Sequence, residues 1–170
     1  MPPRRSFRDV IHCLCAALHP QALTAVIAAC AFAAASARAE DLGPVRFYAD
    51  LSADEQSATT ISDGIGRVDF ALDRDTVRLS WTVTYKNLTS PATAAHIHGP
   101  QRPGTNAGVQ IDLAPAGLGL PLKGSAVLTD AQLEYLLSGR MYVNVHTTKY
   151  AVGELRGQIQ RVPPPAPLTN

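Results

Sequence analysis

The strongest structural signal in this 170-residue chain is a regular alternation of apolar and polar side chains. It is clearest in 77–85, where every second residue is large and apolar: Val77, Leu79, Trp81, Val83 and Tyr85. Consecutive side chains of a strand point to opposite faces of its sheet, so such a segment has one buried and one solvated face. Strands of a parallel sheet are buried on both faces and are apolar throughout, so the alternation predicts antiparallel sheets.

The rest of the chain after residue 40 contains further short segments of this kind, separated by turn-forming residues such as Asp63-Gly64 and Gly99-Pro100. The predicted strands cover 45–51, 67–73, 77–85, 92–98, 108–113, 124–128, 141–146 and 153–161. Short strands at this spacing predict an all-β fold, either an antiparallel two-sheet sandwich or a small Greek-key barrel.

One segment has the period of a helix instead, and it predicts one short helix near 130–138. Thr129 and Gln132 have the spacing of a capping box, in which each side chain bonds the backbone of the other residue. Leucines then recur at helical spacing, and Gly139 can end the helix in the left-handed conformation. We interpret the helix as a connection between strands.

Residues 1–39 have the layout of a secretory signal peptide that is cleaved after Ala39. Arginines open the chain, an apolar run extends from Ala22 to Ala35, and Ala37-Arg38-Ala39 is a small-x-small cleavage site. The apolar run is shorter than the ~20 residues that a membrane-spanning helix needs, although a retained N-terminal anchor is an alternative. The sequence therefore predicts a periplasmic or secreted protein with no membrane span in the mature chain.

The export route has two readings beyond general secretion. Arg4-Arg5-Ser6-Phe7 resembles a twin-arginine signal, which serves proteins that are exported already folded. Ile27-Ala28-Ala29-Cys30 resembles a lipobox, which would make Cys30 a lipid anchor, but the apolar run continues beyond it.

Cleavage would leave a β domain at 40–161 and a Pro-rich tail at 162–170 that we expect to be disordered. All three cysteines precede Ala39, so the mature chain would have neither a disulfide nor a thiolate ligand. The formal net charge of +1 gives no electrostatic reason to expect nucleic acid as a partner.

Three histidines remain after Ala39, and they are candidate metal ligands. His96 and His98 are two residues apart on one predicted strand, so they share a face; His146 ends another strand. If the strands are neighbours, three neutral imidazoles with an open position would suit copper or zinc.

The same surface would carry the candidate binding residues Asn144, Glu154 and Arg156. Glu154 could orient a histidine from outside the ligand set. Two alternatives remain open: a purely structural polar network, in which Arg156 pairs with Glu154 or another carboxylate, and a site for an organic ligand or a peptide. The chain has no G-x-S-x-G, P-loop or H-E-x-x-H motif, so no catalytic residue is predicted.

Three pieces of the sequence together resemble the CHRD domain, the repeat of the secreted protein chordin. They are AHIHGP at Ala95–Pro100, the run LLSGRMYVNVHT that ends at Thr147, and GELRGQI at Gly153–Ile159. The resemblance extends over about 45–161 and implies a single extracytoplasmic β domain, here a single-domain exported bacterial member of the family. It implies no settled activity, and growth-factor binding does not carry over because chordin's cysteine-rich modules are missing.

The H-x-H strand also resembles copper/zinc superoxide dismutase. That family needs about six histidines for two metals, so a dinuclear dismutase is excluded on ligand count. We expect an exported, non-enzymatic binding or structural module whose partner is an unknown protein, ligand or metal ion. The alternative is a mononuclear copper- or zinc-binding periplasmic protein that uses His96, His98 and His146.

Overall fold

The computed structural model describes residues 43–164 and 166. The predicted signal peptide, with its twin-arginine and lipobox motifs, lies outside the described residues, as do 165 and 167–170 of the tail. The described tail residues 162–164 and 166 are exposed and have no regular secondary structure. No helix in the described part of the chain is long and apolar enough to cross a membrane.

The described residues form strands and one short helix, α3 (Asp130–Leu137). The strands are β1 (Val45–Ser52), β2 (Ile65–Leu72), β3 (Arg78–Lys86), β4 (Ala92–His98), β5 (Val109–Asp112), β6 (Leu122–Val127), β7 (Tyr142–Thr147), β8 (Leu155–Gln158) and β9 (Gln160–Arg161). The predicted all-β class is confirmed, and so is the single short helix.

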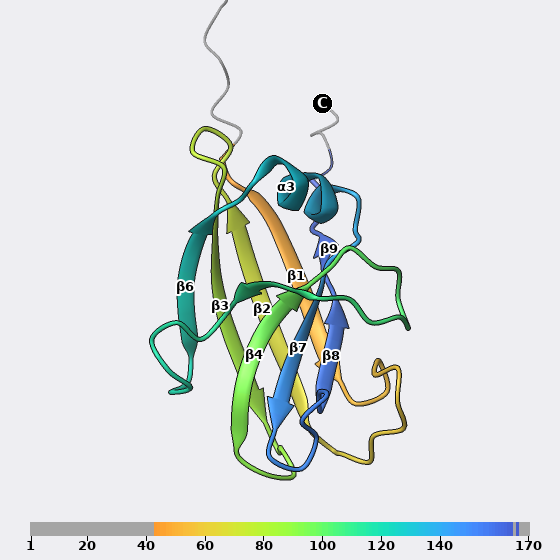
Figure 1. Ribbon diagram of the computed structural model, residues 1–170. Helices are drawn as coiled ribbons and strands as arrows, with labels where there is room; N and C mark the ends of the chain where they lie inside the picture. The colour runs from red at the N-terminus through yellow and green to blue at the C-terminus, as the bar shows by residue number, and fades with distance from the viewer. Residues whose placement is uncertain (1–42, 165, 167–170) are drawn as a thin grey trace, which may run out of the picture. The chain divides into compact units, whose positions relative to one another are not determined.

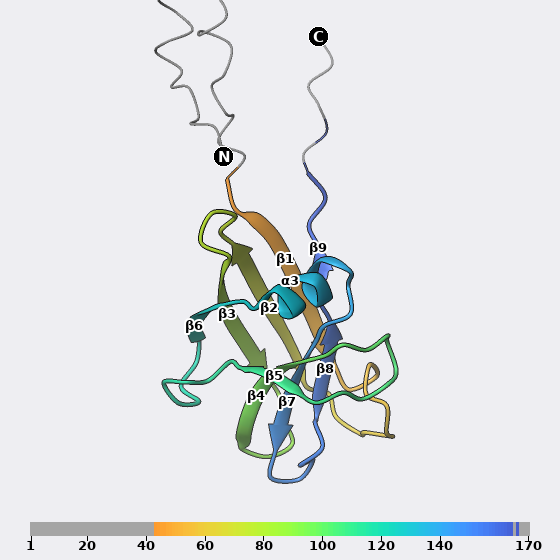
Figure 2. The ribbon, with the colours of Figure 1, turned by 45° about the horizontal axis from the view of Figure 1, so that its top comes forward.

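All the strand pairs are antiparallel, and one continuous hydrogen-bonded path joins them in the order β5-β4-β7-β8-β1-β2-β3-β6. The path curls into a nearly closed barrel, so the barrel alternative describes the fold (Figures 1 and 2). Strands β4, β7 and β8 lie side by side, although β4 is distant in sequence from β7 and β8, which follow each other (Figure 1).

Two predicted strand boundaries are corrected by the structure. The strand predicted at 153–161 is divided at Ile159, whose N–H donates to the carbonyl of Met141 while β9 pairs with β1. The strand predicted from Val77 begins at Arg78, because Val77 has a positive φ of 52°. In the turn before it, Asp73 accepts hydrogen bonds from the backbone N–H groups of Asp75 and Thr76.

The apolar side chains of the alternating pattern fill the inside of the barrel. Phe70 and Trp81 face each other across the β2–β3 pair, and both are buried. The Trp81 indole N–H donates to the Leu113 carbonyl at 3.0 Å, which connects β3 to the segment after β5. Gly124 leaves space for the indole, since a Cβ there would lie 2.8 Å from Trp81 Cε2.

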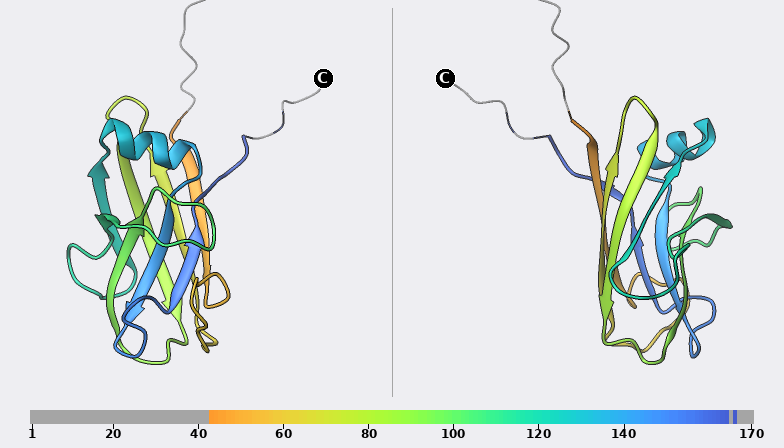
Figure 3. Two further views of the ribbon diagram at one scale, coloured as in Figure 1. Left: turned by 45° about the vertical axis from the view of Figure 1, so that its right-hand side comes forward. Right: turned by 90° about the vertical axis from the view of Figure 1, so that its left-hand side faces the viewer.

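Helix α3 lies across one end of the barrel (Figure 3). Its predicted capping box is present: Gln132 N–H donates to Thr129 Oγ1 at 3.2 Å, and Thr129 N–H donates to Gln132 Oε1 at 3.0 Å. Leu136 is buried against the core, and Gly139 follows the helix with φ of 68°. The helix thus has the role predicted for it, a connection that adds a leucine to the core.

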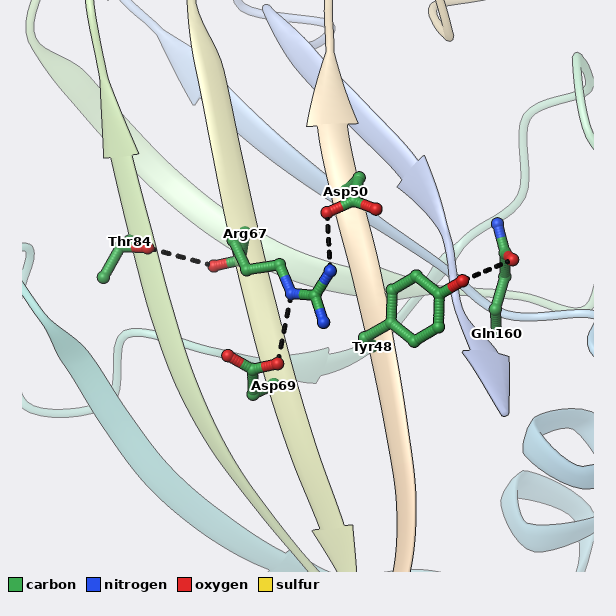
Figure 4. A network of polar contacts seen from close by, with 6 residues as sticks. All are labelled: Tyr48, Asp50, Arg67, Asp69, Thr84 and Gln160. Atoms are coloured by element: carbon green, nitrogen blue, oxygen red, sulfur yellow. Dashed lines mark hydrogen bonds and ion pairs between the residues drawn. The ribbon is translucent and has the colours of Figure 1, made fainter. Parts of the chain in front are cut away.

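The outer surface of the barrel differs between its two halves. On β1 and β2 it is an exposed polar network, in which Arg67 pairs with Asp50 at 2.8 Å and with Asp69 at 3.1 Å and lies over Tyr48 (Figure 4). On β4, β7 and β8 the outward-facing polar residues are largely buried; they include His98, Asn144 and Arg156. Polar groups held out of water on a sheet's outer face need an explanation.

Candidate metal centre

The pairing of β4 with β7 brings the three predicted histidines together. His96 lies opposite Asn144, and His146 lies opposite Ala94, so the rings of β4 and β7 meet over one stretch of the outer face. The ring centroids are 5.0 Å apart for His96–His146, 5.6 Å for His96–His98 and 5.7 Å for His98–His146. The predicted meeting of the three imidazoles at one place is therefore observed.

Hydrogen bonds to main-chain carbonyls define the tautomers of two of these rings. Nδ1 of His98 lies 3.0 Å from the Ala107 carbonyl oxygen, and Nδ1 of His146 lies 3.0 Å from that of Ala151. A carbonyl only accepts hydrogen bonds, so each Nδ1 carries the proton and each Nε2 presents a lone pair. This is the arrangement in which histidine binds a metal through Nε2.

Each ring also has one buried nitrogen that finds no hydrogen-bond partner among the described residues: Nδ1 of His96, Nε2 of His98 and Nε2 of His146. Buried polar atoms are normally hydrogen-bonded, so three such atoms in one place point to a missing partner. One ligand nitrogen from each ring lies within 4.8 Å of one from each of the others.

Burial lowers the pKa of His98 and of His146 below the usual value of histidine, because desolvation disfavours the charged imidazolium. The hydrogen bonds to the Ala107 and Ala151 carbonyls raise these pKa values, but less strongly. Charge repulsion within the triad lowers them further, and for His98 Arg156 adds to this effect. Both rings are thus neutral at pH 7, as metal ligands must be.

The residues present fit a transition metal ion. Three imidazole nitrogens around a tetrahedral zinc, each about 2.1 Å from it, lie roughly 3.4 Å from one another, and the ligand nitrogens here lie within 4.8 Å of one another. The cluster contains no cysteine or carboxylate among the described residues, which leaves a fourth coordination position without a protein ligand. Copper and zinc are the metals that imidazole ligands suit best.

Tyr142 and Arg156 fix the loop that supports His98. The Tyr142 ring stacks on His98 with 5.1 Å between centroids, and its hydroxyl accepts a hydrogen bond from Ala107 N–H at 2.9 Å. Arg156 lies over the Tyr142 ring, with its guanidinium carbon 3.5 Å from the ring centroid. The guanidinium also donates hydrogen bonds to Asn106 Oδ1 and to the Thr105 carbonyl. These contacts position the Ala107 carbonyl that sets the His98 tautomer.

Asn144 fixes the turn that supports His146. Its Nδ2 donates to the Val152 carbonyl at 3.0 Å, next to the Ala151 carbonyl that accepts from His146. Its Oδ1 accepts from Gln56 Nε2 at 2.8 Å, which attaches the 53–64 loop to the same point. Of the predicted binding residues, Asn144 and Arg156 are thus brought to the triad, where they hold its loops.

Glu154, the third predicted binding residue, belongs to a separate buried network. Its carboxylate accepts hydrogen bonds from the Ser62, Thr89 and Thr147 hydroxyls and from Thr89 N–H, at 2.7–2.9 Å. No ion pair joins it to Arg156 within the described part of the chain, and the Nδ1 atoms of His98 and His146 use main-chain carbonyls instead. The role suggested for Glu154, orienting a histidine, therefore falls to Ala107 and Ala151.

A comparison with protein families finds a match to the CHRD domain over residues 47–159. The chain belongs to the CHRD domain family. The match begins within β1, ends just after β8, and includes His96, His98 and His146. Comparisons with curated proteins and with solved structures gave no match.

Several residues that build this site in the CHRD domain escape sequence reasoning. Ala107 and Ala151 act through carbonyl groups that every residue has, so their side chains give no signal. Gly153 has φ of 130°, and a Cβ there would lie 2.6 Å from Asn144 Cγ. A glycine two residues before a strand, as Gly153 is before β8, is a recognisable hint of such a close approach, whereas Gln56 has no comparable signal.

Proposed function

We propose that this CHRD-domain protein is an exported module that binds one copper or zinc ion through His96, His98 and His146, without turning over a substrate. The observation that carries the proposal is a cluster of three histidines, each with a buried ring nitrogen that has no partner among the described residues. One ligand nitrogen of each ring lies within 4.8 Å of one from each of the others. Two of them belong to rings whose other nitrogen is already fixed by a carbonyl, so the lone pairs are preorganised for a metal.

We infer that the protein does not turn over a substrate because the buried charged groups near the triad already have hydrogen-bond partners. Glu154, the buried carboxylate, accepts four hydrogen bonds, and Arg156 holds a loop. Neither group is placed to exchange a proton with a substrate at the triad. Binding of a metal, for carriage or storage, needs only the three histidines, with Asn144 and Arg156 holding the loops around them.

Copper is expected to bind more tightly than zinc. For a given set of nitrogen ligands, affinity among divalent first-row metals is highest for Cu²⁺ and lower for Zn²⁺. Competition between the two ions for the protein should therefore end with copper in the site.

The place of action proposed for the protein is the periplasm or the exterior of the cell. The support is the signal-peptide layout of 1–39 and the lack of cysteine after Ala39. Mass spectrometry of protein recovered from its native host should find a mature chain that begins at Glu40. A chain retaining residues 1–39 in the cytoplasm would contradict export, and a lipid on Cys30 would indicate anchoring.

Metal analysis of the exported protein tests the metal site. We expect about one equivalent of copper or zinc per chain, lost in His146→Ala, since a structural or catalytic site normally fills. Tyr48→Phe is the matched control, because it removes a hydroxyl of the exposed network on β1 (Figure 4) and should retain the metal. Less than about 0.1 equivalent, before and after incubation with both ions, would reject the metal site.

A binding or structural module that needs no metal is the second candidate. It is favoured by the two ends of the sheet path, β5 and β6, each paired along one side within the described residues. A strand with an unpaired edge can add a strand from another chain. If this second candidate is correct, variants of the three histidines would leave partner binding unchanged. Blocking the unpaired edge of β6 would abolish partner binding.

A further inference from the structure

The charge balance around the triad has a consequence for the fourth coordination position. The three ligands are neutral imidazoles, so a divalent ion keeps its full charge of +2 after binding them. Two ionised groups are buried in the described structure: Arg156, which is positive, and Glu154, whose negative charge is held by four donors in a separate network. No buried carboxylate is therefore left to balance the metal ion, and an unbalanced buried charge is costly.

The position of Arg156 adds to this effect. Its side chain is 1% exposed, and its guanidinium donates to the neutral acceptors Asn106 and Thr105 rather than to a carboxylate. It lies against Tyr142, which stacks on His98, so a positive charge sits one ring away from a ligand. The charge of Glu154, by contrast, is surrounded by four donors in its own network.

The carboxylates on the neighbouring elements do not supply the missing charge inside the site. Asp112 lies opposite His96 in the β4–β5 pair, but it is exposed and its Oδ1 accepts a hydrogen bond from Ala114 N–H. Glu55 in the 53–64 loop is also exposed. Exposed charges are screened by water and salt far more than buried ones.

We infer that the metal-loaded triad takes a small monoanion as its fourth ligand and that Arg156 strengthens the binding of that anion. The inference rests on the proposed metal site and names the class of ligand that completes it. A histidine triad with one open position normally accepts water or a substrate there. Here the neutral ligand set and the buried guanidinium favour an anion over water.

The test uses azide as the probe and Cu²⁺-loaded protein, with copper content measured first. Titration with sodium azide, followed by electron paramagnetic resonance and visible absorption, should give a saturable change. Sodium perchlorate at the same ionic strength, a weakly coordinating anion, is the control and should give none. Copper content near one equivalent with no response to azide would overturn the inference and leave the metal site standing, whereas absence of copper would overturn the metal site itself.

Two variants separate the charge of Arg156 from its contact with the 99–108 loop. Both Arg156→Gln and Arg156→Lys lose the paired hydrogen bonds to Asn106 and Thr105, but only lysine keeps the charge. In copper-loaded protein, we expect azide to bind roughly tenfold more weakly to R156Q, and R156K to stay within a few-fold of the unaltered protein. Equal affinities for R156Q and R156K would remove Arg156 from the proposal, as would loss of azide binding in both.

Discussion

The amide of Asn144 occupies the space next to Gly153 where any other residue would place its side chain. A Cβ on Gly153 would lie 2.6 Å from Asn144 Cγ, and φ at this glycine is 130°. The close approach lets Asn144 bond the Val152 carbonyl and so fix the turn whose Ala151 carbonyl orients His146. A main-chain turn is thereby made part of the proposed metal site.

Gly153→Ala is therefore expected to disturb both the fold and the site. The strained φ and the displaced Asn144 should lower the free energy of unfolding by about 2–4 kcal/mol, measured by urea denaturation. Gly117→Ala is the control: φ is also positive there, at 99°, but a Cβ would meet no atom within 4 Å. It should cost only the backbone strain, about 1 kcal/mol. Equal losses in the two variants would contradict the role of the Gly153–Asn144 contact.

Tyr142→Phe tests the support of the His98 ring. The change removes the hydroxyl that accepts from Ala107 N–H at 2.9 Å while it keeps the ring that stacks on His98. Copper affinity, measured by competition with a chelator, should fall about 10- to 100-fold, as for other residues that orient a metal ligand. Tyr48→Phe, which alters the exposed network, should keep the unaltered affinity. An unchanged affinity in Y142F would show that the Ala107 carbonyl needs no such support.

The hydrogen bonds of the buried Glu154 carboxylate predict that the folded protein becomes less stable in acid. Burial raises the pKa of its carboxyl, but hydrogen bonds from Ser62, Thr89 and Thr147 together outweigh burial and hold the pKa below its usual value. A carboxylate with a lower pKa in the folded chain stabilises the fold above the unfolded-state pKa of about 4.3, and this contribution is lost as the pH falls through the folded-state pKa. The free energy of unfolding should therefore decline below about pH 4.3.

The comparison with Glu154→Gln isolates this group. The amide cannot ionise and presents only one acceptor oxygen, so at pH 7 the variant should be about 1–3 kcal/mol less stable. Its urea midpoints between pH 3 and pH 7 should vary less than those of the unaltered protein. Parallel pH profiles for the two proteins would assign the acid sensitivity to other carboxylates.

Trp81→Phe probes the region where the barrel is not closed by strand pairing. The indole N–H of Trp81 donates to the Leu113 carbonyl at 3.0 Å, and loss of this buried bond should cost about 1–3 kcal/mol. Unfolding should be followed by circular dichroism, because the variant removes the single tryptophan and with it the tryptophan fluorescence. Copper affinity should not change, since Trp81 has no contact with the triad in the interactions described above. A fall in both quantities would mean that the two regions are coupled.

Local patterns in the chain were sufficient for much of the fold. The two-residue period of 77–85 predicts a strand with one buried face wherever the segment packs, and Thr129 with Gln132 forms its capping box within one turn of helix. The same period puts His96 and His98 on one face of β4 before any partner strand is known. These features depend on neighbours in sequence, which is why the sequence predicts them.

Features that depend on contacts between distant segments needed the folded chain. Only the β4–β7 register brings His146 beside His96, and only the loop conformations aim the Ala107 and Ala151 carbonyls at the imidazoles. The alternation of the sequence predicts Glu154 on the same face as Arg156, yet its carboxylate accepts hydrogen bonds from donors in other loops. Carbonyl groups are common to all residues, and strand pairing across the chain leaves no local mark. The three histidines could therefore be identified in advance, but the main-chain carbonyls that orient two of them could not.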